Sequence, residues 1–537
     1  MAMPNSHELL NRLEQLNAIG VALSAEHDHD RLMEMILLGA KQITNADGGT
    51  LYTVTDDHRL RFEIMRTDTL GIVLGGTTGK PIPFAPLPLY DDAGAPNNSM
   101  VAAYAVLNDK TVNIDDAYEV VGFDFSGTRK FDQNTGYRSK SFLTIPMKNR
   151  ENEIIGVLQL LNAMAPGNGE IVPFTQENER LVESLASQAA VALTNHNLIE
   201  GLKKLFESFI ELIADAIDEK SPYTGGHCRR VPELAMMIAE AANIQQDGVF
   251  ESFQLSDREM YELRIAAWLH DCGKVTTPEY VVDKPTKLTT IFDRIALIDQ
   301  RFELLKAQAE IEMLRKLATQ RESVEQLESQ LQGTWKLLDE DRAFLRAANV
   351  GGEFMTAEHQ VRVQRIAAYP FHENGVSKPF LSEDEVKNLN IAKGTLTDEE
   401  REIINNHIVV TINMLESLPY PKALRRVPEY AGGHHERMDG KGYPRHLTRD
   451  QMSIPARMMG IADIFEALTA RDRPYKKAKT LSESLQILGK MKLDNHIDPD
   501  VFDLFIRQKI YLQYARQFLE PEQIDEVDEC AIPGYTP

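Results

Sequence analysis

Histidines and carboxylates gather in several short polar segments after residue 220, and paired thiols do not accompany them. Five of the 14 histidines and two aspartates make up this set: His227, His270, Asp271, His407, His434, His435 and Asp463. Imidazole nitrogens and carboxylate oxygens without thiolates suit iron, manganese or similar ions that keep open coordination positions. A single histidine on a helix is more often a hydrogen-bonded residue than a ligand, so the interpretation depends on the whole set. The set predicts a catalytic metal site.

Asp271 directly follows His270 in the segment His-Asp-Cys-Gly-Lys, which ends at Lys274. Neighbouring side chains on a helix diverge by about 100°, so both reach one site only if that site lies between them. A carboxylate that bridges two ions meets this condition, and two ions about 3.5–4 Å apart can share an attacking hydroxide. The spacing alone therefore indicates metal-assisted hydrolysis of a phosphoester.

The elements that must position these residues are predicted to be helices. From Phe206 to about Tyr514 nearly every segment has the apolar period of a helix, and strand-like alternation is absent. Residues 292–348 within this stretch are charged and helical, with apolar residues at coiled-coil spacing from Ile291 to Ala309. Turn residues follow at 370–379, before helical patterning resumes at Glu383. We expect an all-α domain that carries an inserted helical arm.

The preceding residues, from about Ile19 to Leu193, mix helical and strand-like patterns. The clearest strands have alternating apolar residues and lie at residues 49–55, 60–65, 141–148 and 153–161. The last two are joined by the polar turn Asn149-Arg150-Glu151-Asn152 and therefore predict a hairpin. This part of the chain is predicted to be an α+β unit built on an antiparallel sheet.

One long helix is predicted between the two parts. Its apolar residues alternate spacings of four and three, at Leu198, Leu202, Leu205, Phe209, Leu212 and Ala216. This pattern is a coiled-coil seam of about three heptads. Two interpretations are open: two chains pair along the seam, or the helix packs its apolar side on its own domain.

Length, composition and charge limit the classes of protein that fit. The 537 residues favour two or three domains, and 43% hydrophobic with 26% charged residues is typical of a folded globular chain. The formal net charge of −23 disfavours binding to a nucleic-acid polymer, although metal ions can supply positive charge for a small anionic substrate. No segment has about 20 consecutive apolar residues, and the first ten do not resemble a signal peptide. We expect no membrane association and a cytoplasmic protein.

Three ordered motifs in the helical part resemble the HD-GYP subgroup of the HD phosphohydrolase superfamily. They are His270-Asp271-Cys-Gly-Lys274, then His434-His435-Glu436-Arg-Met-Asp439-Gly-Lys-Gly442-Tyr443-Pro444, then Arg473-Pro474-Tyr475-Lys476. The double histidine makes the resemblance specific, and it covers about residues 206–505 apart from the arm. Members of this family are bacterial phosphodiesterases that open the ring of cyclic di-GMP. The resemblance implies the same substrate for this chain.

The resemblance also implies roles for individual residues. The metal ligands would be His227, His270, Asp271, His407, His434, His435 and Asp463. Asp271 would bridge two divalent ions, most simply iron or manganese, and Lys274 would stabilise charge that develops on the scissile phosphate. Catalysis is therefore assigned to His270, Asp271 and Lys274.

Two departures from the family pattern affect these expectations. Some members hold a third metal with a Glu four residues before the first ligand histidine, where this chain has Tyr223. We therefore expect two ions per chain and the linear dinucleotide pGpG as product, with further hydrolysis to GMP left open. The arm, about residues 292–391, interrupts the domain between its ligands. Because His407 is retained beyond it, we expect the arm to loop out of the site.

Three further residues are expected at the substrate. By resemblance, Arg473 and Lys476 contact the second phosphate or a guanine, whereas the alternative is that they are helix-capping charges. Tyr443 lies in the rigid Gly-Tyr-Pro turn just after the double histidine. Its ring serves either closure over the substrate or docking of a partner.

The α+β part resembles a GAF domain, especially the phosphodiesterase type, in Phe-Asp-Gln-Asn-Thr-Gly-Tyr-Arg at 131–138 and Gly-Val-Leu-Gln-Leu-Leu-Asn at 156–162. Such domains bind small molecules, often cyclic nucleotides, in a pocket over the sheet. The Asn-Lys, Phe and Asp-Glu motif of the family is here Asn162-Ala163, Phe174 and Asn178-Glu179. Ala163 and Asn178 thus replace the Lys and the Asp of the family motif, and the ion pair that would brace the pocket is lost. The domain is therefore either a sensor of an unknown small molecule or a structural dimerisation module.

These expectations give one architecture: a GAF domain at 19–195, a connecting coiled-coil helix at 196–217, an HD-GYP domain at 206–515 with its insertion, and a C-terminal tail at 516–537. The predicted function is hydrolysis of cyclic di-GMP under control of the GAF domain, in a homodimer. One alternative is a phosphodiesterase that prefers cyclic GMP-AMP. The other is a non-catalytic protein that binds nucleotide or docks on a diguanylate cyclase. The presence of all seven candidate ligands favours the enzyme.

Overall fold

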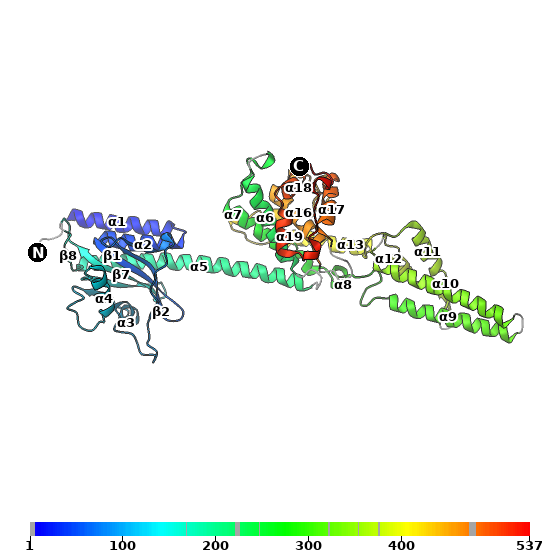
Figure 1. Ribbon diagram of the computed structural model, residues 1–537, viewed down its shortest axis with the longest axis horizontal. Helices are drawn as coiled ribbons and strands as arrows, with labels where there is room; N and C mark the ends of the chain where they lie inside the picture. Colours follow the sequence, from blue (N-terminus) through cyan, green and yellow to red (C-terminus); the bar gives the residue numbers. More distant parts are fainter. Residues whose placement is uncertain are drawn as a thin grey trace. The chain divides into compact units, whose positions relative to one another are not determined.

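The structure is a computed structural model of the chain (Figure 1), and it describes residues 6–167, 169–220, 226–245, 248–319, 323–352, 354–373, 376–471 and 479–536. The chain divides into two compact units, Met1–Phe206 and Glu207–Pro537. The boundary between them falls inside the long helix α5 (Gln176–Lys220).

The first unit is built on one antiparallel sheet. Its strands follow the order β3-β2-β1-β7-β6-β5, with β4 paired to β2 and β8 paired to β7. The strands are β1 (Ala46–Val54), β2 (Arg59–Thr67), β3 (Ile72–Gly75), β4 (Leu87–Pro88), β5 (Val112–Ile114), β6 (Phe142–Lys148), β7 (Ile154–Met164) and β8 (Ile171–Val172).

The four strands expected from alternation are confirmed as β1, β2, β6 and β7, with ends that differ by a few residues. The expected hairpin is also confirmed, since β6 and β7 pair antiparallel from Phe142 opposite Leu161 to Lys148 opposite Ile154. Alternate residues of β6, such as Leu143 and Ile145, are buried in the core. The α+β fold therefore follows from the period-two pattern of these strands.

Helices cover both faces of this sheet. The helices are α1 (Ser6–Ala25), α2 (His29–Thr44), α3 (Val101–Asn108), α4 (Ser126–Thr135) and the first half of α5. On one face, α1, α2 and α5 share a core with the sheet in which Leu37, Leu51 and Leu185 are fully buried. On the other face, residues of α3 and α4 line a cavity of about 360 Å³ together with β1 and β2.

Helix α5 presents two different apolar faces. Ile210, Ala214 and Ile217 are buried in the core of the second unit. The seam residues lie on the other face and are 52–64% exposed: Leu198, Leu202, Leu205, Phe209 and Leu212. The apolar side that packs on its own domain is thus not the heptad seam. Within the described residues, the seam is left facing solvent.

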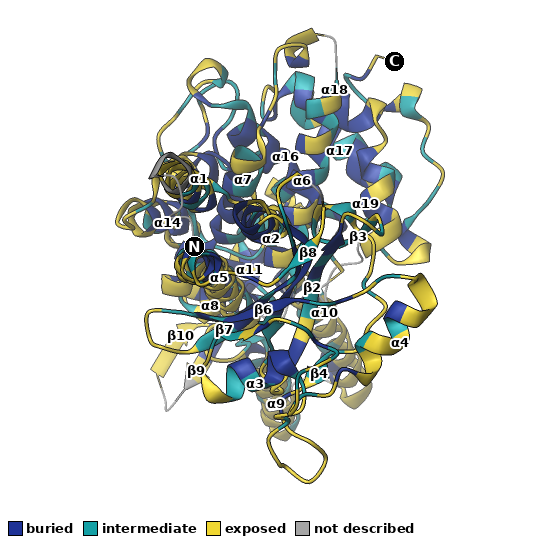
Figure 2. Cartoon of the chain, turned by 90° about the vertical axis from the view of Figure 1, so that its left-hand side faces the viewer, coloured by how far each residue is buried: buried dark blue, intermediate teal, exposed yellow. Residues whose placement is uncertain are grey.

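The second unit is helical around one large core. Its helices outside the arm are α6 (His227–Ile244), α7 (Asp257–Leu269), α8 (Glu279–Val282), α13 (Asp398–Asn405), α14 (His407–Glu416), α15 (Val427–Gly432), α16 (Ile454–Thr469), α17 (Leu481–Leu493), α18 (Pro499–Arg507) and α19 (Ile510–Phe518). Figure 2 shows α6, α7 and α16 largely buried, and residues such as Met459 and Phe465 of α16 are fully enclosed. The predicted helical domain is confirmed.

The arm contains the long helices α9 (Ile295–Ala318) and α10 (Val324–Val350), then α11 (Ala357–Ala367) and α12 (Glu383–Leu389). It has a core of its own, which includes Phe302, Leu345 and Phe380. The structure adds one detail to the helical expectation here: strands β9 (Pro370–Glu373) and β10 (Val376–Pro379) form a small antiparallel sheet within the segment expected to be a turn. Helix α12 begins at Glu383, as predicted.

Two buried lysines close the base of the arm. Lys284 Nζ donates to both carboxylate oxygens of Glu400, at 2.8 and 2.7 Å, and to Asn388 Oδ1 at 3.0 Å. Lys287 Nζ donates to the carbonyl oxygens of Leu389 and Ile391, at 3.1 and 2.8 Å. The two ends of the insertion are therefore held together by side chains of the interrupted domain.

The stretch expected as a C-terminal tail packs against the second unit, because Ile532 and Tyr535 are buried in its core. Among the described helices, none combines the length and the apolar character needed to cross a membrane.

Candidate metal centre

Helix α6 begins at His227, so this side chain projects from a helix N-terminus. Asp218, near the end of α5, supports that start: its carboxylate accepts hydrogen bonds from the backbone N–H of Gly226 at 2.9 Å and of Cys228 at 3.3 Å. Such bonds satisfy amides that have no partner inside the helix. The position of His227 therefore depends on the last turns of α5.

His270 and Asp271 follow the last residue of α7, where the chain changes to a short 3-10 turn at Cys272–Thr276. The backbone of this turn packs closely against α14. A Cβ on Gly273 would lie 2.0 Å from the carbonyl oxygen of His407, so only glycine fits here. The N–H of Gly273 also donates to Thr411 Oγ1 at 2.9 Å. This contact brings Asp271 beside His407, the first residue of α14.

The remaining candidate ligands come from two neighbouring elements. His434 and His435 lie just after α15, and Asp463 lies in α16. Five separate segments of the chain thus supply seven side chains. The structure brings all seven together inside the second unit.

The first group of ligand atoms consists of His227, His270 and one oxygen of Asp271, all within 4.8 Å of one another. Asp271 Oδ2 lies 3.3 Å from Nε2 of each of these histidines. Asp463 Oδ1 completes the group, at 3.3 Å from His227 Nε2 and 3.8 Å from His270 Nε2. Two imidazoles and two carboxylates therefore converge on one point.

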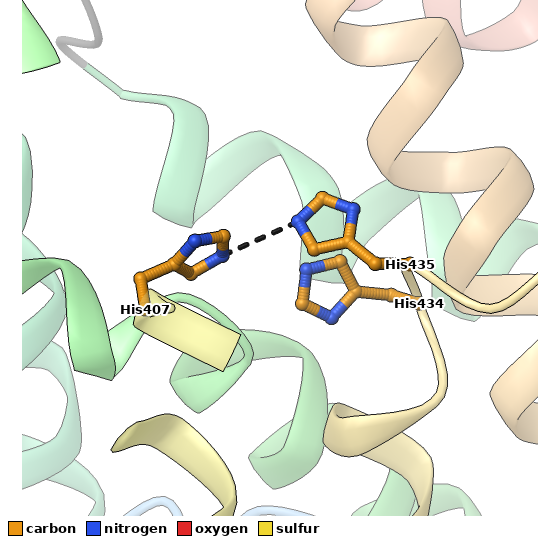
Figure 3. Close-up of side chains that lie close together, drawn as sticks. All are labelled: His407, His434 and His435. Atoms are coloured by element: carbon orange, nitrogen blue, oxygen red, sulfur yellow. Dashed lines mark hydrogen bonds between the residues drawn. The ribbon is translucent and has the colours of Figure 1, made fainter. Parts of the chain in front are cut away.

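The second group consists of His407, His434 and His435, whose rings point toward one another (Figure 3). His435 Nε2 and His407 Nε2 are 3.2 Å apart. Asp271 Oδ1 lies 3.2 Å from His407 Nε2. Asp271 thus turns one oxygen toward each group, which is the arrangement of a carboxylate shared by two ions.

The protonation of the histidines fits metal ligation. Nδ1 of His270, His407 and His434 lies 2.6, 2.5 and 2.6 Å from a backbone carbonyl oxygen three residues earlier. A carbonyl only accepts, so each Nδ1 carries a proton, and in the neutral imidazole Nε2 then keeps the lone pair. Nε2 of His227, His270 and His434 is buried without a hydrogen-bond partner among the described residues. Buried polar atoms rarely lack partners, and divalent metal ions would satisfy these nitrogens.

Electrostatics favour these charge states at the double histidine and at Asp463. Burial alone would lower the pKa of His227, but the charge of Glu466 and the two nearby aspartates raise it well above its usual value. Burial lowers the pKa of His435 to about 4 and holds that of His434 well below its usual value, so both imidazoles are neutral at pH 7. Burial alone would raise the pKa of Asp463, but the adjacent His227 and the other histidines of the two groups lower it. Neutral imidazoles and ionised carboxylates are the forms that bind metal ions.

Lys274 extends its ammonium group into the centre, where Nζ lies 2.5 Å from Asp271 Oδ2. Burial alone would lower its pKa, but the charge of Asp271 outweighs this and raises it. The backbone of the lysine turn is held from α5, because Lys220 Nζ donates to the carbonyl oxygens of Lys274 at 3.2 Å and Val275 at 2.5 Å. Lys274 is therefore a fixed positive charge beside the two groups of ligands.

Tyr443 is half-buried, not the exposed aromatic that partner docking would use. Its ring stacks on the imidazole of His435, with ring centroids 4.9 Å apart and an interplanar angle of 23°. The preceding glycine allows this turn, because a Cβ on Gly442 would lie 2.3 Å from the backbone nitrogen of Arg437. Of the two roles expected for Tyr443, this position favours closure of the site.

Sequence reasoning missed two buried carboxylates that support the ligands. Glu466 accepts a very short hydrogen bond from His227 Nδ1 and another from Arg230 Nε at 2.6 Å. Glu436 accepts from the backbone N–H of Arg445 and Leu447, at 2.7 and 2.9 Å, and so holds the loop after the double histidine. Glu466 follows Asp463 by three residues, a spacing that puts both on one face of α16. That spacing was the available signal.

Three residues discussed above, Tyr223, Arg473 and Lys476, lie outside the described residues. The number of ions that depends on Tyr223 and the substrate contacts of the two basic residues stay predictions.

Comparison with known families agrees with this division of the chain. A GAF domain matches residues 28–193, and two HD domain families match residues 224–343 and 366–501. The first HD match contains His227, His270 and Asp271, and the second contains the remaining four ligands. The two matches therefore divide the seven candidate ligands between them. The chain combines a GAF domain with an HD domain that the arm interrupts.

Curated proteins similar to this chain carry phosphodiesterase names. The 3′3′-cGAMP-specific phosphodiesterase 1 of Vibrio cholerae is 43% identical over 81 residues, which are 15% of this chain and 19% of that protein. Phosphodiesterase 3 of the same name and organism is 26% identical over 338 residues, 62% of this chain and 46% of that protein. A cyclic di-GMP phosphodiesterase of Pseudomonas aeruginosa is 37% identical over 114 residues, 21% of this chain and 26% of that protein.

The aligned parts thus span less than half the length of each of these relatives. Among solved structures, the GAF domain from an Acinetobacter phosphoenolpyruvate-protein phosphotransferase aligns over 37% of this chain and 99% of its own, at 14% identity and a TM-score of 0.26.

Proposed function

We propose that this chain is a metal-dependent phosphodiesterase that hydrolyses a cyclic dinucleotide. The observation that carries the proposal is the placement of Asp271, whose two oxygens face two separate groups of histidines at 3.2–3.3 Å. A shared carboxylate between two histidine-rich positions is typical of centres that hydrolyse phosphoesters with a pair of ions. The names of the relatives support this class of reaction.

The seven side chains around Asp271 would hold two divalent ions. When bound, such ions activate a water molecule and neutralise charge on phosphoryl oxygens. The chain itself contributes three things. The neutral His434 and His435 each offer a ring nitrogen with a lone pair for ligation, Lys274 provides a cation for the phosphate oxygens, and Tyr443 covers one side of His435. Iron and manganese suit a set of imidazole and carboxylate donors.

Cyclic di-GMP is the substrate that the family resemblance favours, with the linear pGpG as product. Cyclic GMP-AMP is the second candidate, because relatives with that substrate in their names align with this chain. Product analysis with both dinucleotides, on protein purified without oxygen and with its metals counted, separates these candidates. We expect two ions per chain, and three firmly bound ions would contradict the role given to Tyr223.

The test of the reaction is Asp271→Asn, which keeps the volume of the side chain but removes the shared negative charge. We expect loss of turnover in a folded protein, because both groups of ligands lose a donor. Asp503→Asn is the matched control, since Asp503 pairs with Lys492 at 2.6 Å on the surface of the same unit. Full turnover in metal-replete Asp271→Asn would overturn the proposal. Tight nucleotide binding without turnover in the wild type would favour the non-catalytic alternative.

We further propose that the GAF domain binds a small, planar and uncharged molecule in its cavity of about 360 Å³. Phenyl rings of Phe62, Phe125 and Phe131 line the cavity, and the polar lining includes Gln159. Among the described lining residues none is Lys or Arg, and Asp124 adds a negative charge. A cyclic mononucleotide, favoured by the resemblance, would meet no cation for its phosphate. Thermal shifts with guanosine and with cyclic GMP distinguish the two ligands, and a shift with cyclic GMP alone would contradict the uncharged ligand.

Finally, we propose a homodimer that pairs along the α5 seam. The support is that five large apolar side chains of the seam are exposed while a different face of α5 packs on the second unit. A diguanylate cyclase partner stays a prediction from the family resemblance. The stacking of the half-buried Tyr443 ring on His435 does not add support for it.

A further inference from the structure

The arm carries a second apolar stripe that its own core does not use. Helices α9 and α10 lie side by side as a helical hairpin (Figure 1), with Ile298 and Phe302 of α9 fully buried between them. About 100–160° further around α9, four large apolar side chains are 46–52% exposed: Leu297, Leu304, Ile311 and Leu314. A helix that packs against a single neighbour needs only one such stripe.

This exposed stripe has heptad spacing. If Leu297, Leu304 and Ile311 occupy a positions, then Gln300, Ala307 and Leu314 occupy the d positions between them. The stripe therefore contains one polar residue and no charge over about three heptads. It reads as a coiled-coil seam that faces solvent, on the side of α9 away from α10.

The charges beside the stripe indicate which helix fits it. Glu303 and Glu310 lie at the g positions, and Arg301 and Arg315 lie at e positions. In a parallel pair of identical helices, Glu310 of one copy faces Arg315 of the other, because g residues contact the e residue five positions later. An antiparallel pair would place Glu beside Glu and Arg beside Arg. The stripe is thus complementary to a second, parallel copy of itself.

The charged residues beside the two halves of the stripe differ in whether they already form ion pairs within the chain. Glu303 bonds Arg342 at 2.5 Å and Arg301 bonds Glu385 at 2.5 Å within the same chain. Glu310 and Arg315 are exposed in the distal half of α9. Beside the proximal half, α9 and the β9-β10 segment line a groove of about 1250 Å³, which leaves room for a neighbouring helix.

We infer that this face of α9 is a self-association surface, on which the α9 helices of two copies of this chain pair in parallel. The surface is separate from the α5 seam and does not depend on catalysis. It gives the insertion a structural role: the arms of two chains would join into one bundle of α9 and α10 helices. The proposed hydrolysis can fail without affecting this inference, because the test below reads only the geometry of pairing.

Site-specific cross-linking tests the pairing. In full-length protein with Cys530→Ser, which removes the exposed cysteine and leaves only the buried Cys228 and Cys272, Ile311→Cys places a thiol at an a position. In a parallel pair, this thiol meets its own counterpart at a distance that a disulfide spans. We expect more than half of the chains to form a disulfide dimer under mild oxidation. Lys316→Cys, exposed on a different side of α9, is the control and should give less than a tenth.

A charge swap tests the direction of pairing. In the Ile311→Cys background, Glu310→Arg places like charges across the seam and should slow cross-linking at least tenfold. Adding Arg315→Glu restores the opposite charges and should restore the rate. Equal yields from Ile311→Cys and Lys316→Cys, no dimer from Ile311→Cys in a chain whose circular dichroism is unchanged, or no rescue by the swap would each overturn the inference. A dimer held by α5 alone would give the second of these outcomes.

Discussion

Glu466→Gln is the most informative single substitution in the candidate metal centre, because it changes a residue outside the proposed set of ligands. Glu466 is 1% exposed and accepts from both His227 Nδ1 and Arg230 Nε. A glutamine keeps the shape, but its one amide oxygen serves only one of these donors, and the other then faces an NH2 group. The substitution also removes the negative charge that makes the His227 imidazole a stronger donor.

The magnitude follows from this loss. Partners that orient a ligand histidine are worth about 10–100-fold in metal affinity, or about 1.4–2.7 kcal/mol. Only the position that contains His227 and His270 should be affected, because His407 and His434 take their orientation from backbone carbonyls. We therefore expect one of two ions to be lost first as a chelator is titrated, with turnover restored by excess metal.

Metal titration by calorimetry and turnover at graded metal concentration measure this effect. Glu262→Gln is the control, since Glu262 is also buried but accepts from the backbone of Arg426. Equal affinity for both ions in Glu466→Gln and the wild type would refute the reasoning. So would an equal loss in Glu262→Gln, because the effect would then come from general destabilisation.

Three further outcomes are expected. Gly273→Ala places a Cβ against the backbone of His407, and it should abolish turnover and destabilise the protein by about 1–3 kcal/mol in denaturant melts. The control is Gly333→Ala on α10, where the Cβ meets no other atom and the protein should become more stable by about 1 kcal/mol. Burial lowers the pKa of Lys287 to about 8, so between pH 8 and 10.5 the unfolded chain binds a proton that the folded chain does not. As the pH rises through this range, the free energy of unfolding of the wild type should increase by up to about 3 kcal/mol relative to Lys287→Met, measured in paired melts. Changing Leu205 and Phe209 together to Glu should weaken dimerisation at least 100-fold, or by about 2.7 kcal/mol, as measured by light scattering. A wild-type protein that is monomeric at micromolar concentration would contradict pairing along the α5 seam.

Sequence reasoning was most successful where a repeated apolar pattern or a short motif limits what a segment can form. The period-two strands of the first unit could be predicted, because the apolar alternation restricts them strongly. The motifs also named side chains that the structure places close together, such as His270 and His434. The β9-β10 pair was missed, since prolines at 370 and 379 bound it and read as turn signals. Short strands with little alternation leave almost no periodic signal.

Glu466 shows a different limit. An acidic residue in an apolar helix can be buried or exposed, and only the tertiary contact with His227 distinguishes the two. The same holds for Asp218 and Lys220, whose contacts cross to distant segments. Which face of α5 packs on the second unit also depends on that unit's surface. Apart from the three-residue spacing of Asp463 and Glu466, local pattern gives no information about these long-range contacts.

The hydrogen bonds behind four of the candidate ligand histidines make His227 differ from the other three in how substitutions can alter it. His270, His407 and His434 donate to main-chain carbonyls, which every amino acid possesses, so no single replacement of the accepting residue removes the acceptor. His227 alone of these four donates to a side chain, Glu466. A substitution at Glu466 therefore changes the hydrogen bond to His227, whereas no side-chain substitution removes the carbonyl acceptors of the other three histidines. A protein engineer who wishes to alter metal preference has a single adjustable position behind this set, and it lies in α16.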